Sequence, residues 1–394
     1  MSAMRVGVDA TSWVNRRGFG RFARNAVGRL VESDPETTYV FYIDEQSAED
    51  AQLPSQIEES RVRLGAAPSE AAAAGSSRSL RDLARLSLAV RRDRLDAFLF
   101  PSVYTYFPVV GTPTVIGLHD TIVEELPELT VPSRRERLAA GLKHRVAVRR
   151  ATRLFTVSEA SRSAIASKFG IARDRLRLVP EAPDPVFSPR SGAPLAAGLA
   201  EVGLAPGDPF YLFAGGISPH KNVETLIDAF ALSRGRAGPG FPVLVLVGDL
   251  ENEAYLSSAR SVRERIERHE LGAAVLLPGF VTDEALACLY SAATAVVIPS
   301  LAEGFGLPAV EAAACGAPVA LSDLPPHRET LGEAALFFPP RDVDALAAIL
   351  ERLATDEELR QQVGAQARQA VAGLTWDAAA AELRVLIREA ARLA

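Results

Sequence analysis

The chain has little cysteine and no excess of positive charge. Among its 394 residues there are two cysteines, Cys288 and Cys315, and they do not form a C-x-x-C pair. A disulfide framework or a zinc site is therefore not expected, and a reducing cytoplasm fits. The formal net charge is −6, so the overall charge does not point to a nucleic-acid partner.

Long apolar runs are also lacking. No stretch of about 18 apolar residues occurs, which argues against a membrane-spanning helix. The first ten residues, MSAMRVGVDA, lead directly into a strand-like run, so we expect no signal peptide. With 48% hydrophobic and 23% charged residues, the composition is typical of a globular protein, and we expect a cytoplasmic one.

Lysine is the scarcest source of positive charge. Of the 43 basic residues, only Lys143, Lys168 and Lys221 are lysines. In a chain that otherwise uses arginine for positive charge, each lysine is a candidate for a specific role.

Short apolar runs alternate with amphipathic stretches along the whole chain. Such runs are typical of buried strands, and alternation with helices predicts parallel sheets covered on both faces. The predicted strands are residues 5–10, 39–44, 61–65, 96–102, 112–120 and 153–158, then 210–216, 242–249, 274–279, 295–300, 318–323 and 335–340.

A proline-rich stretch interrupts the alternation. Residues 180–209 read as a linker, because proline ends both helices and strands. The fold class is therefore α/β, with two doubly wound, Rossmann-like domains. We expect one domain over residues 1–185, a second over 186–375, and a terminal helix over 376–394 that could pack on either domain.

Near the N-terminus, Gly18, Gly20 and Ala23 spell G-x-G-x-x-A. A dinucleotide-binding loop needs its first glycine directly after the strand, and here residues 11–17 intervene. Three interpretations stay open at this point: a dinucleotide loop, a flexible turn before a helix, or a loop whose backbone N–H groups face a phosphate or sugar.

The second half of the chain has a clearer pattern. The strand FYLFAGG ends at Gly215 and Gly216, which let the backbone approach a ligand closely. Lys221 follows, and Asn222 can cap the next helix. A cation at the carboxyl edge of a parallel sheet suits a diphosphate, although an isolated lysine is more often simply solvated.

A second loop carries two carboxylates. Glu303 follows a predicted strand, Glu311 lies about one turn into a helix, and the amide groups of Phe305, Gly306 and Leu307 would point at an anion. Carboxylates beside an anion site favour hydroxyl partners, such as those of sugars and ribose. The alternative is that both glutamates are ordinary surface residues.

The stretch E-G-F-G-L-P-A-V-E resembles the E-x7-E motif of retaining glycosyltransferases of the GT-B fold, family four (GT4). Other stretches resemble that family in order and spacing across nearly the whole chain. They are RRGFGRFARN (16–25), GLHDTIVEELPE (117–128), AGGISPHKNVETLIDAF (214–230) and LPGFVTDEALACLYSAATAVVIPS (277–300).

The resemblance implies roles for individual residues in binding a nucleoside-diphosphate sugar. Glu303 would bind hydroxyls of the donor sugar, Glu311 the ribose, and Lys221 with the three loop amides the diphosphate. Many relatives have arginine where this chain has Gly216, so a second phosphate cation is needed. The candidates are His220, when protonated, and Arg21 or Arg17 beside the glycines Gly18 and Gly20, which would approach the donor or acceptor.

His119 lies just after a predicted strand. The resemblance places it near the donor's anomeric carbon, with Asp120 as the side chain that could orient it. An isolated histidine is otherwise more often structural.

For the reaction, the resemblance implies a retaining hexosyl transfer, of mannose or glucose type, to a glycan, a lipid-linked or a small-molecule acceptor. We expect neither a metal nor a separate cofactor, since no D-x-D follows a strand. A nucleotide-sugar 2-epimerase and an inactive glycan-binding relative are the alternatives, and a dehydrogenase is a more distant one.

Residues 133–153 carry a dense positive charge with Leu138, Leu142, Val146 and Val148 interleaved. A solvated helix packed on the sheet is the ordinary interpretation. The alternative is a peripheral contact with anionic lipid on the inner face of the membrane.

Overall fold

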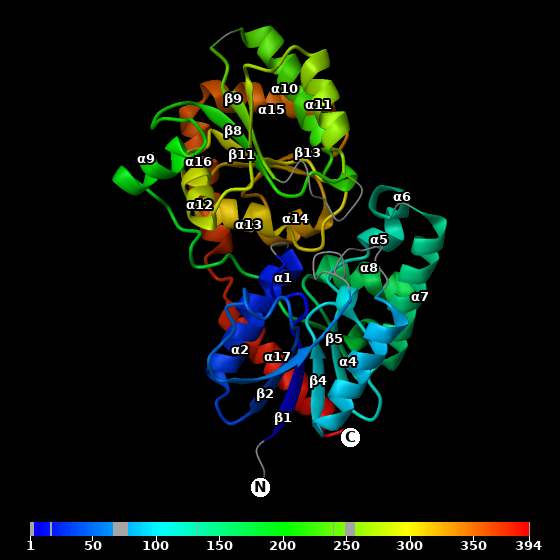
Figure 1. Cartoon of the computed structure of the whole chain (residues 1–394). Helices are drawn as coiled ribbons and strands as arrows, with labels where there is room; N and C mark the ends of the chain where they lie inside the picture. Colours follow the sequence, from blue (N-terminus) through cyan, green and yellow to red (C-terminus); the bar gives the residue numbers. More distant parts are fainter. Residues whose placement is uncertain are drawn as a thin grey trace. The chain divides into compact units, whose positions relative to one another are not determined.

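The computed structural model describes residues 4–15, 18–65, 78–131, 133–238, 240–248 and 257–393. The chain forms two compact units, each with a sheet of its own (Figure 1). The first unit comprises Met1–Glu181 and Thr375–Ala394, and the second comprises Ala182–Leu374. Arg17, one of the candidate phosphate cations, lies outside the described residues.

The first unit contains a seven-stranded parallel sheet in the order β3-β2-β1-β4-β5-β6-β7. All four residues of β4 are buried, as expected when helices cover both faces of a parallel sheet. The strands are β1 (Arg5–Asp9), β2 (Thr38–Asp44), β3 (Ile57–Val62), β4 (Ala97–Phe100), β5 (Thr114–Gly117), β6 (Arg153–Thr156) and β7 (Leu176–Leu178).

Helices flank this sheet (Figure 1). Leu86 and Val90 of α4 pack with Phe98 and Phe100 in one hydrophobic core. The helices are α1 (Gly18–Phe22), a π-helical segment (Ala23–Val27), α2 (Gly28–Ser33), α4 (Leu80–Arg92), α5 (Ile122–Glu125), α6 (Pro127–Thr130), α7 (Arg134–Arg150), α8 (Glu159–Phe169), the 3-10 turns Val103–Thr105 and Arg173–Arg175, and α17 (Trp376–Ala391).

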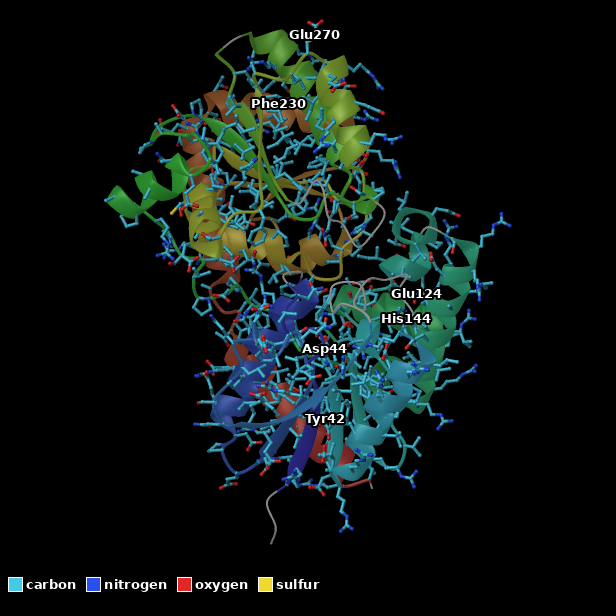
Figure 2. All side chains as sticks on the ribbon, in the orientation of Figure 1. Tyr42, Asp44, Glu124, His144, Phe230 and Glu270 are labelled. Atoms are coloured by element: carbon cyan, nitrogen blue, oxygen red, sulfur yellow. The ribbon has the colours of Figure 1, made fainter. Side chains whose placement is uncertain are left out.

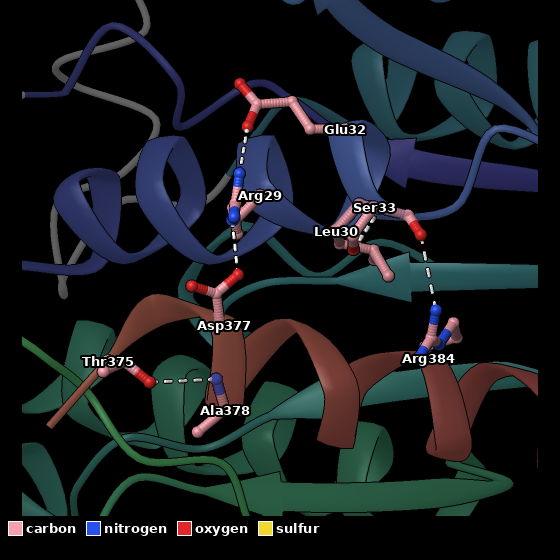
Figure 3. A network of polar contacts seen from close by, with 8 residues as sticks. All are labelled: Arg29, Leu30, Glu32, Ser33, Thr375, Asp377, Ala378 and Arg384. Atoms are coloured by element: carbon pink, nitrogen blue, oxygen red, sulfur yellow. Dashed lines mark hydrogen bonds and ion pairs between the residues drawn. The ribbon is translucent and has the colours of Figure 1, made fainter. Parts of the chain in front are cut away.

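The terminal helix α17 belongs to the first unit, although it follows the whole second unit in sequence. It packs beside α2 and across β4, β5 and β6. Asp377 accepts a bond from Arg29 Nε at 2.5 Å, and Arg384 donates to the carbonyl of Ser33 at 3.3 Å (Figure 3). The chain therefore returns to its first unit through its last helix.

The second unit contains a six-stranded parallel sheet in the order β10-β9-β8-β11-β12-β13. Its strands are β8 (Phe210–Ala214), β9 (Val243–Val247), β10 (Val275–Gly279), β11 (Ala295–Ile298), β12 (Val319–Ser322) and β13 (Leu336–Phe338). Its helices are α9 (Gly192–Ala200), the 3-10 turn Pro219–Lys221, α10 (Val223–Ala237), α11 (Ala259–Arg268), α12 (Asp283–Ala292), α13 (Leu307–Ala314), α14 (Pro325–Leu331), α15 (Val343–Thr355) and α16 (Glu357–Val371).

Every predicted strand is present, although the one expected at 61–65 lies at Ile57–Val62. One strand was missed, and two local predictions were wrong. Strand β7 was not predicted, because only three residues form it. The stretch 180–209 is not purely a linker, since α9 lies within it and packs on α12. Gly18 and Gly20 lie in α1 rather than in a loop. A Cβ on Gly20 would be 2.0 Å from the carbonyl oxygen of Asn15, so glycine lets the first turn of α1 approach the preceding backbone.

Candidate functional site

The lysine and the glutamate that were expected at the carboxyl edge of the second sheet are in contact. Lys221 follows β8 and Glu303 follows β11, and these strands are neighbours in the sheet. Their carboxyl ends therefore lie at the same edge, and Lys221 Nζ donates to Glu303 Oε1 at 2.7 Å. The Glu303 side chain is 7% exposed and that of Lys221 is 19% exposed, so the carboxylate is buried and the ammonium faces solvent in part.

The surroundings of Glu303 keep it ionised. Burial alone would raise its pKa, but the charge of Lys221, the charge of His327 once that ring is protonated at low pH, and the bonds from Lys221 and Ser300 together outweigh burial. The Ser300 hydroxyl donates to the same Oε1 at 2.6 Å. The pKa of Glu303 is consequently lowered to about 2, and the residue is an acceptor of hydrogen bonds across the physiological range.

Asn222 holds the loops around this pair together. Its Nδ2 donates to the carbonyl of Pro299 at 2.9 Å and to that of Pro340 at 2.6 Å, so it ties the ends of three strands. It has a left-handed backbone (φ +55°) at the start of α10, but its side chain makes no capping bond there. Asn222 therefore occupies the N-cap position as expected, but without a side-chain bond to the helix backbone. The amide of Leu301 donates to the carbonyl of His220 at 2.7 Å, which joins the Lys221 turn to the Glu303 loop.

The G-F-G turn begins α13 as expected. Gly306 is left-handed (φ +89°) at the N-cap, and Pro308 occupies the first turn. Among the described residues, the amides of Phe305, Gly306 and Leu307 donate to no carbonyl, as is usual before the first helical turn. Glu311 is 3% exposed, so it is not the surface residue that the alternative interpretation required.

A buried histidine beside this turn was not predicted. His327 of α14 is completely buried, and its Nδ1 lies 2.8 Å from the carbonyl oxygen of Ser322. A Cβ on Gly306 would be 2.8 Å from its Cδ2 and 3.2 Å from its Nε2. His327 lies 24 positions after Glu303 in sequence, and no local pattern links the two.

His119 is engaged through both ring nitrogens. Its Nε2 lies 2.8 Å from the carbonyl oxygen of Pro101, and its Nδ1 lies 3.3 Å from Glu181 Oε1. Burial lowers its pKa, but Glu181 and the Pro101 carbonyl raise it by more. An acceptor therefore lies beside each ring nitrogen, and this arrangement favours the protonated ring.

Asp120 is not the orienting partner that was expected. It accepts bonds from the Tyr104 hydroxyl at 3.1 Å and from the amide of Ile122 at 2.9 Å. The carboxylate bonded to His119 is that of Glu181, from a segment far along the chain.

The remaining candidates fall into two groups. In the second unit, Gly216 is exposed, and the Nδ1 of His220 lies 3.2 Å from the Ser218 hydroxyl in the turn before α10. In the first unit, Gly18 is exposed, Gly20 is buried and Arg21 is half-buried on α1.

The carboxyl edge of the first sheet holds a buried polar cluster that the sequence did not reveal. Asp9 accepts from the Thr11 hydroxyl at 2.6 Å, and that hydroxyl accepts a bond from Arg78. Asp44 lies at the end of the neighbouring strand β2 (Figure 2). Among the described residues, Nε and Nη1 of Arg78 and one carboxylate oxygen each of Asp9 and Asp44 have no hydrogen-bond partner.

A second buried pair of a histidine and a glutamate joins helices α7 and α5. His144 of α7 and Glu124 of α5 bond to each other through Nδ1 and Oε1 (Figure 2). The opposite face of α7 exposes Leu138 (77%), Leu142 (64%) and Val146 (38%), whereas Val148 is buried. The three exposed residues follow an i, i+4, i+8 spacing and therefore form one stripe.

Two further structural findings concern metals and membranes. In the parts of the chain that the structure describes, no three histidine, cysteine or acidic side chains are grouped so that they could hold a metal ion. None of the described helices combines the length and apolar composition that crossing a bilayer demands.

Comparison with known proteins places both units in one family. Residues 16–186 match the model of "Glycosyltransferase Family 4", and residues 199–370 match that of "Glycosyl transferases group 1". O-antigen chain mannosyltransferase B of Escherichia coli is 30% identical to this chain, over 73% of this chain and 72% of that protein.

Solved structures show the same fold. Sucrose-phosphate synthase from Thermosynechococcus elongatus aligns with a TM-score of 0.78 at 20% identity, covering 99% of this chain and 100% of that one. HepE from Anabaena, solved in complex with UDP and glucose, aligns with a TM-score of 0.73 at 18% identity, covering 97% of this chain and 98% of that one. Together with the two parallel sheets and the matched family models, these likenesses show that the chain is a glycosyltransferase with the GT-B fold and belongs to family 4 (GT4).

Proposed function

We propose that the protein transfers a hexose of mannose or glucose type from a nucleoside-diphosphate sugar to a hydroxyl of a glycan, a lipid-linked or a small-molecule acceptor. The observation that carries this proposal is the bond between Lys221 and Glu303 at the carboxyl edge of β8 and β11. It puts a cation and a buried carboxylate where open α/β sheets bind ligands. The mannosyltransferase relative supports the choice of sugar.

We propose that Lys221 and Glu303 bind different parts of the nucleoside-diphosphate sugar. Lys221 and the amides of Phe305, Gly306 and Leu307 receive the diphosphate, because both are donors of hydrogen bonds. Glu303 stays ionised and accepts bonds from hydroxyls of the sugar, and Glu311 accepts bonds from the ribose. The diphosphate is the leaving group, so positive charge around it stabilises the transition state.

We assign retention of configuration through a front-face substitution. The bond from the anomeric carbon to the diphosphate breaks first. The acceptor hydroxyl oxygen then bonds to that carbon on the same face, and its proton passes to the departing phosphate. Glu303 is committed to Lys221 and Ser300, which supports a binding role over a nucleophilic one. NMR of the product would show the donor's anomeric configuration, whereas inversion would refute the assignment. We also propose that no metal takes part, which requires full activity in the presence of EDTA.

In the first unit, we propose that His119 acts as a fixed positive charge near the anomeric carbon. An acceptor lies beside each of its ring nitrogens and its pKa is raised, which supports a role for its charge over proton transfer. Gly18, Gly20 and Arg21 stay candidates for donor binding. We place the acceptor at the carboxyl edge of the first sheet, where the unsatisfied atoms of Arg78, Asp9 and Asp44 offer both donors and acceptors to a hydroxyl-bearing ring.

The first experiment is thermal unfolding against GDP, UDP, ADP, TDP and NAD, for wild type and Lys221→Ala. A ligand at about 100 times its dissociation constant stabilises the folded protein by about 2.7 kcal/mol. We expect one nucleoside diphosphate to raise the unfolding temperature of the wild type and not of the variant. A shift with NAD alone would overturn the proposal.

We also propose a peripheral contact with anionic lipid through α7, on the cytoplasmic face of the membrane. Its exposed stripe of Leu138, Leu142 and Val146 is flanked by exposed arginines, which suits an interfacial helix. We expect the protein to sediment with vesicles containing phosphatidylglycerol at low salt and not with phosphatidylcholine vesicles. Leu142→Glu should weaken sedimentation, and absence of binding by the wild type would refute the contact.

A further inference from the structure

The donor site has less positive charge than its ligand requires. Lys221 lies 2.7 Å from an ionised carboxylate, so its charge is already balanced before any ligand arrives. A nucleoside diphosphate brings at least two negative charges. Gly216, in the same loop, is exposed and adds no charge. Binding a diphosphate here therefore needs another cation close to the turn.

His327 is a buried titratable group at that turn. It is completely buried, and its Nδ1 donates to the Ser322 carbonyl at 2.8 Å, which leaves the lone pair of the neutral ring on Nε2. Nε2 has no hydrogen-bond partner among the described residues. The edge that carries Nε2 faces Gly306, because a Cβ there would be 3.2 Å from that nitrogen. A buried polar atom without a partner in a native protein needs an explanation.

The charged groups around His327 come from three elements besides its own. Burial lowers its pKa below the ordinary 6.5, and Lys221 acts in the same direction. Glu303 and Asp323 act in the opposite direction, as does the bond to Ser322. The ring is therefore neutral at pH 7 in the free protein, and an anion placed beside it would favour its protonated form.

We propose that His327 takes up a proton from solvent when the donor diphosphate binds at the G-F-G turn. The Nε2 lone pair forms the new N–H bond, and no other bond changes. The imidazolium then supplies a positive charge beside the G-F-G turn. This inference rests on the proposed function, because it takes the diphosphate to lie on the amides of Phe305, Gly306 and Leu307. His327 is thus a positioning residue that acts through the charge beside the turn.

Proton uptake can be counted directly. UDP and GDP are titrated into the wild type by calorimetry at pH 7 in buffers of different ionisation enthalpy, and the same is done for His327→Gln and His220→Gln. The phosphates of the ligand titrate themselves, so the difference between wild type and variant isolates the protein's contribution. We expect the wild type and His220→Gln to take up more protons than His327→Gln.

The affinity should follow the same linkage. In the wild type, the affinity for the nucleoside diphosphate should fall as pH rises through the pKa of His327 in the complex, by up to about tenfold per pH unit. In His327→Gln, the affinity should depend less on pH. Equal proton counts for wild type and His327→Gln overturn the inference, and so does loss of uptake in His220→Gln. If neither nucleotide gives heat with the wild type, the proposed function fails instead, which is a distinguishable result.

A second measurement covers the case in which His327→Gln does not fold. The chain has five histidines, so carbon-13 labelling of their rings gives few signals to assign. A ring that is neutral in the free wild type at pH 7 and charged when the nucleotide is bound supports the proposal. A His327 ring that remains neutral in the complex overturns it.

Discussion

Each unit pairs a buried carboxylate with a basic side chain at the carboxyl edge of its sheet, but the two pairs differ in how many hydrogen-bonding groups remain without a partner. Both His119 nitrogens in the first unit are used, by Glu181 and by the Pro101 carbonyl. Lys221 in the second unit gives one of its three N–H groups to Glu303, and its side chain remains 19% exposed. A saturated pair stabilises the fold, whereas an unsaturated pair can still receive a ligand.

The largest effect is expected from Lys221→Ala. Removing one preorganised donor from a developing negative charge typically lowers turnover by about 100- to 1000-fold. Stability should change far less, since solvent that reaches the Lys221 position can hydrate Glu303. Steady-state kinetics and thermal unfolding measure the two effects separately.

Lys168→Ala is the matched control for this variant. Lys168 bonds the Glu124 carbonyl on the surface of the first unit, whereas Lys221 and Glu303 belong to the second, so the activity of Lys168→Ala should match that of the wild type. Equal activity of Lys221→Ala and Lys168→Ala would show that the Lys221–Glu303 pair does not bind the donor.

Glu181→Gln should lower the stability of the folded protein, because it removes the carboxylate of the His119–Glu181 pair. The pKa of folded His119 is raised above 6.5, so its contribution is complete below about pH 6.5 and is lost as pH rises through the folded-state pKa. Breaking a buried pair costs about 3 kcal/mol. The unfolding temperature of the variant should therefore be lower at pH 6, with the difference shrinking toward pH 9. A difference that grows with pH would mean that His119 is neutral when folded.

The smallest effect is expected from Gly306→Ala compared with Gly316→Ala. Both glycines are left-handed, at φ +89° and +83°, so both variants incur a backbone cost of about 1–2 kcal/mol. Only the Cβ at 306 would meet a side chain, that of His327 at 2.8 Å. We expect Gly306→Ala alone to weaken nucleoside-diphosphate binding in calorimetry. Equal binding by both variants would show that the turn is not part of the donor site.

Much of the fold could be predicted because the signals are local. The apolar runs AFLF and VLVLV predict buried strands from their own composition, and they form β4 and β9. Their alternation with helices predicts parallel sheets. Where the signal was short or mixed, prediction failed. Strand β7 has three residues, and α9 lies in a stretch that prolines and glycines made resemble a linker.

Some residues of the candidate site were likewise predicted from the sequence and others were not. Lys221, Glu303 and Glu311 were predicted because glycines, charges and spacing within a few residues mark them in sequence. Glu181, His327 and Arg78 were not, because each matters through a partner distant in sequence. Asp120 illustrates the error that follows, since adjacency in sequence suggested a partner for His119 that the fold does not use.

The sequence alone therefore determined the parallel α/β architecture, the family, and the loops that end beside the strands. Tertiary structure decided which loop ends meet, which nitrogen of each histidine is occupied, and that α17 packs on the first unit. The physical reason is that periodicity and turn chemistry act over a few residues. Strand order and burial instead bring together side chains from distant segments, and that proximity sets their hydrogen bonds and their charge.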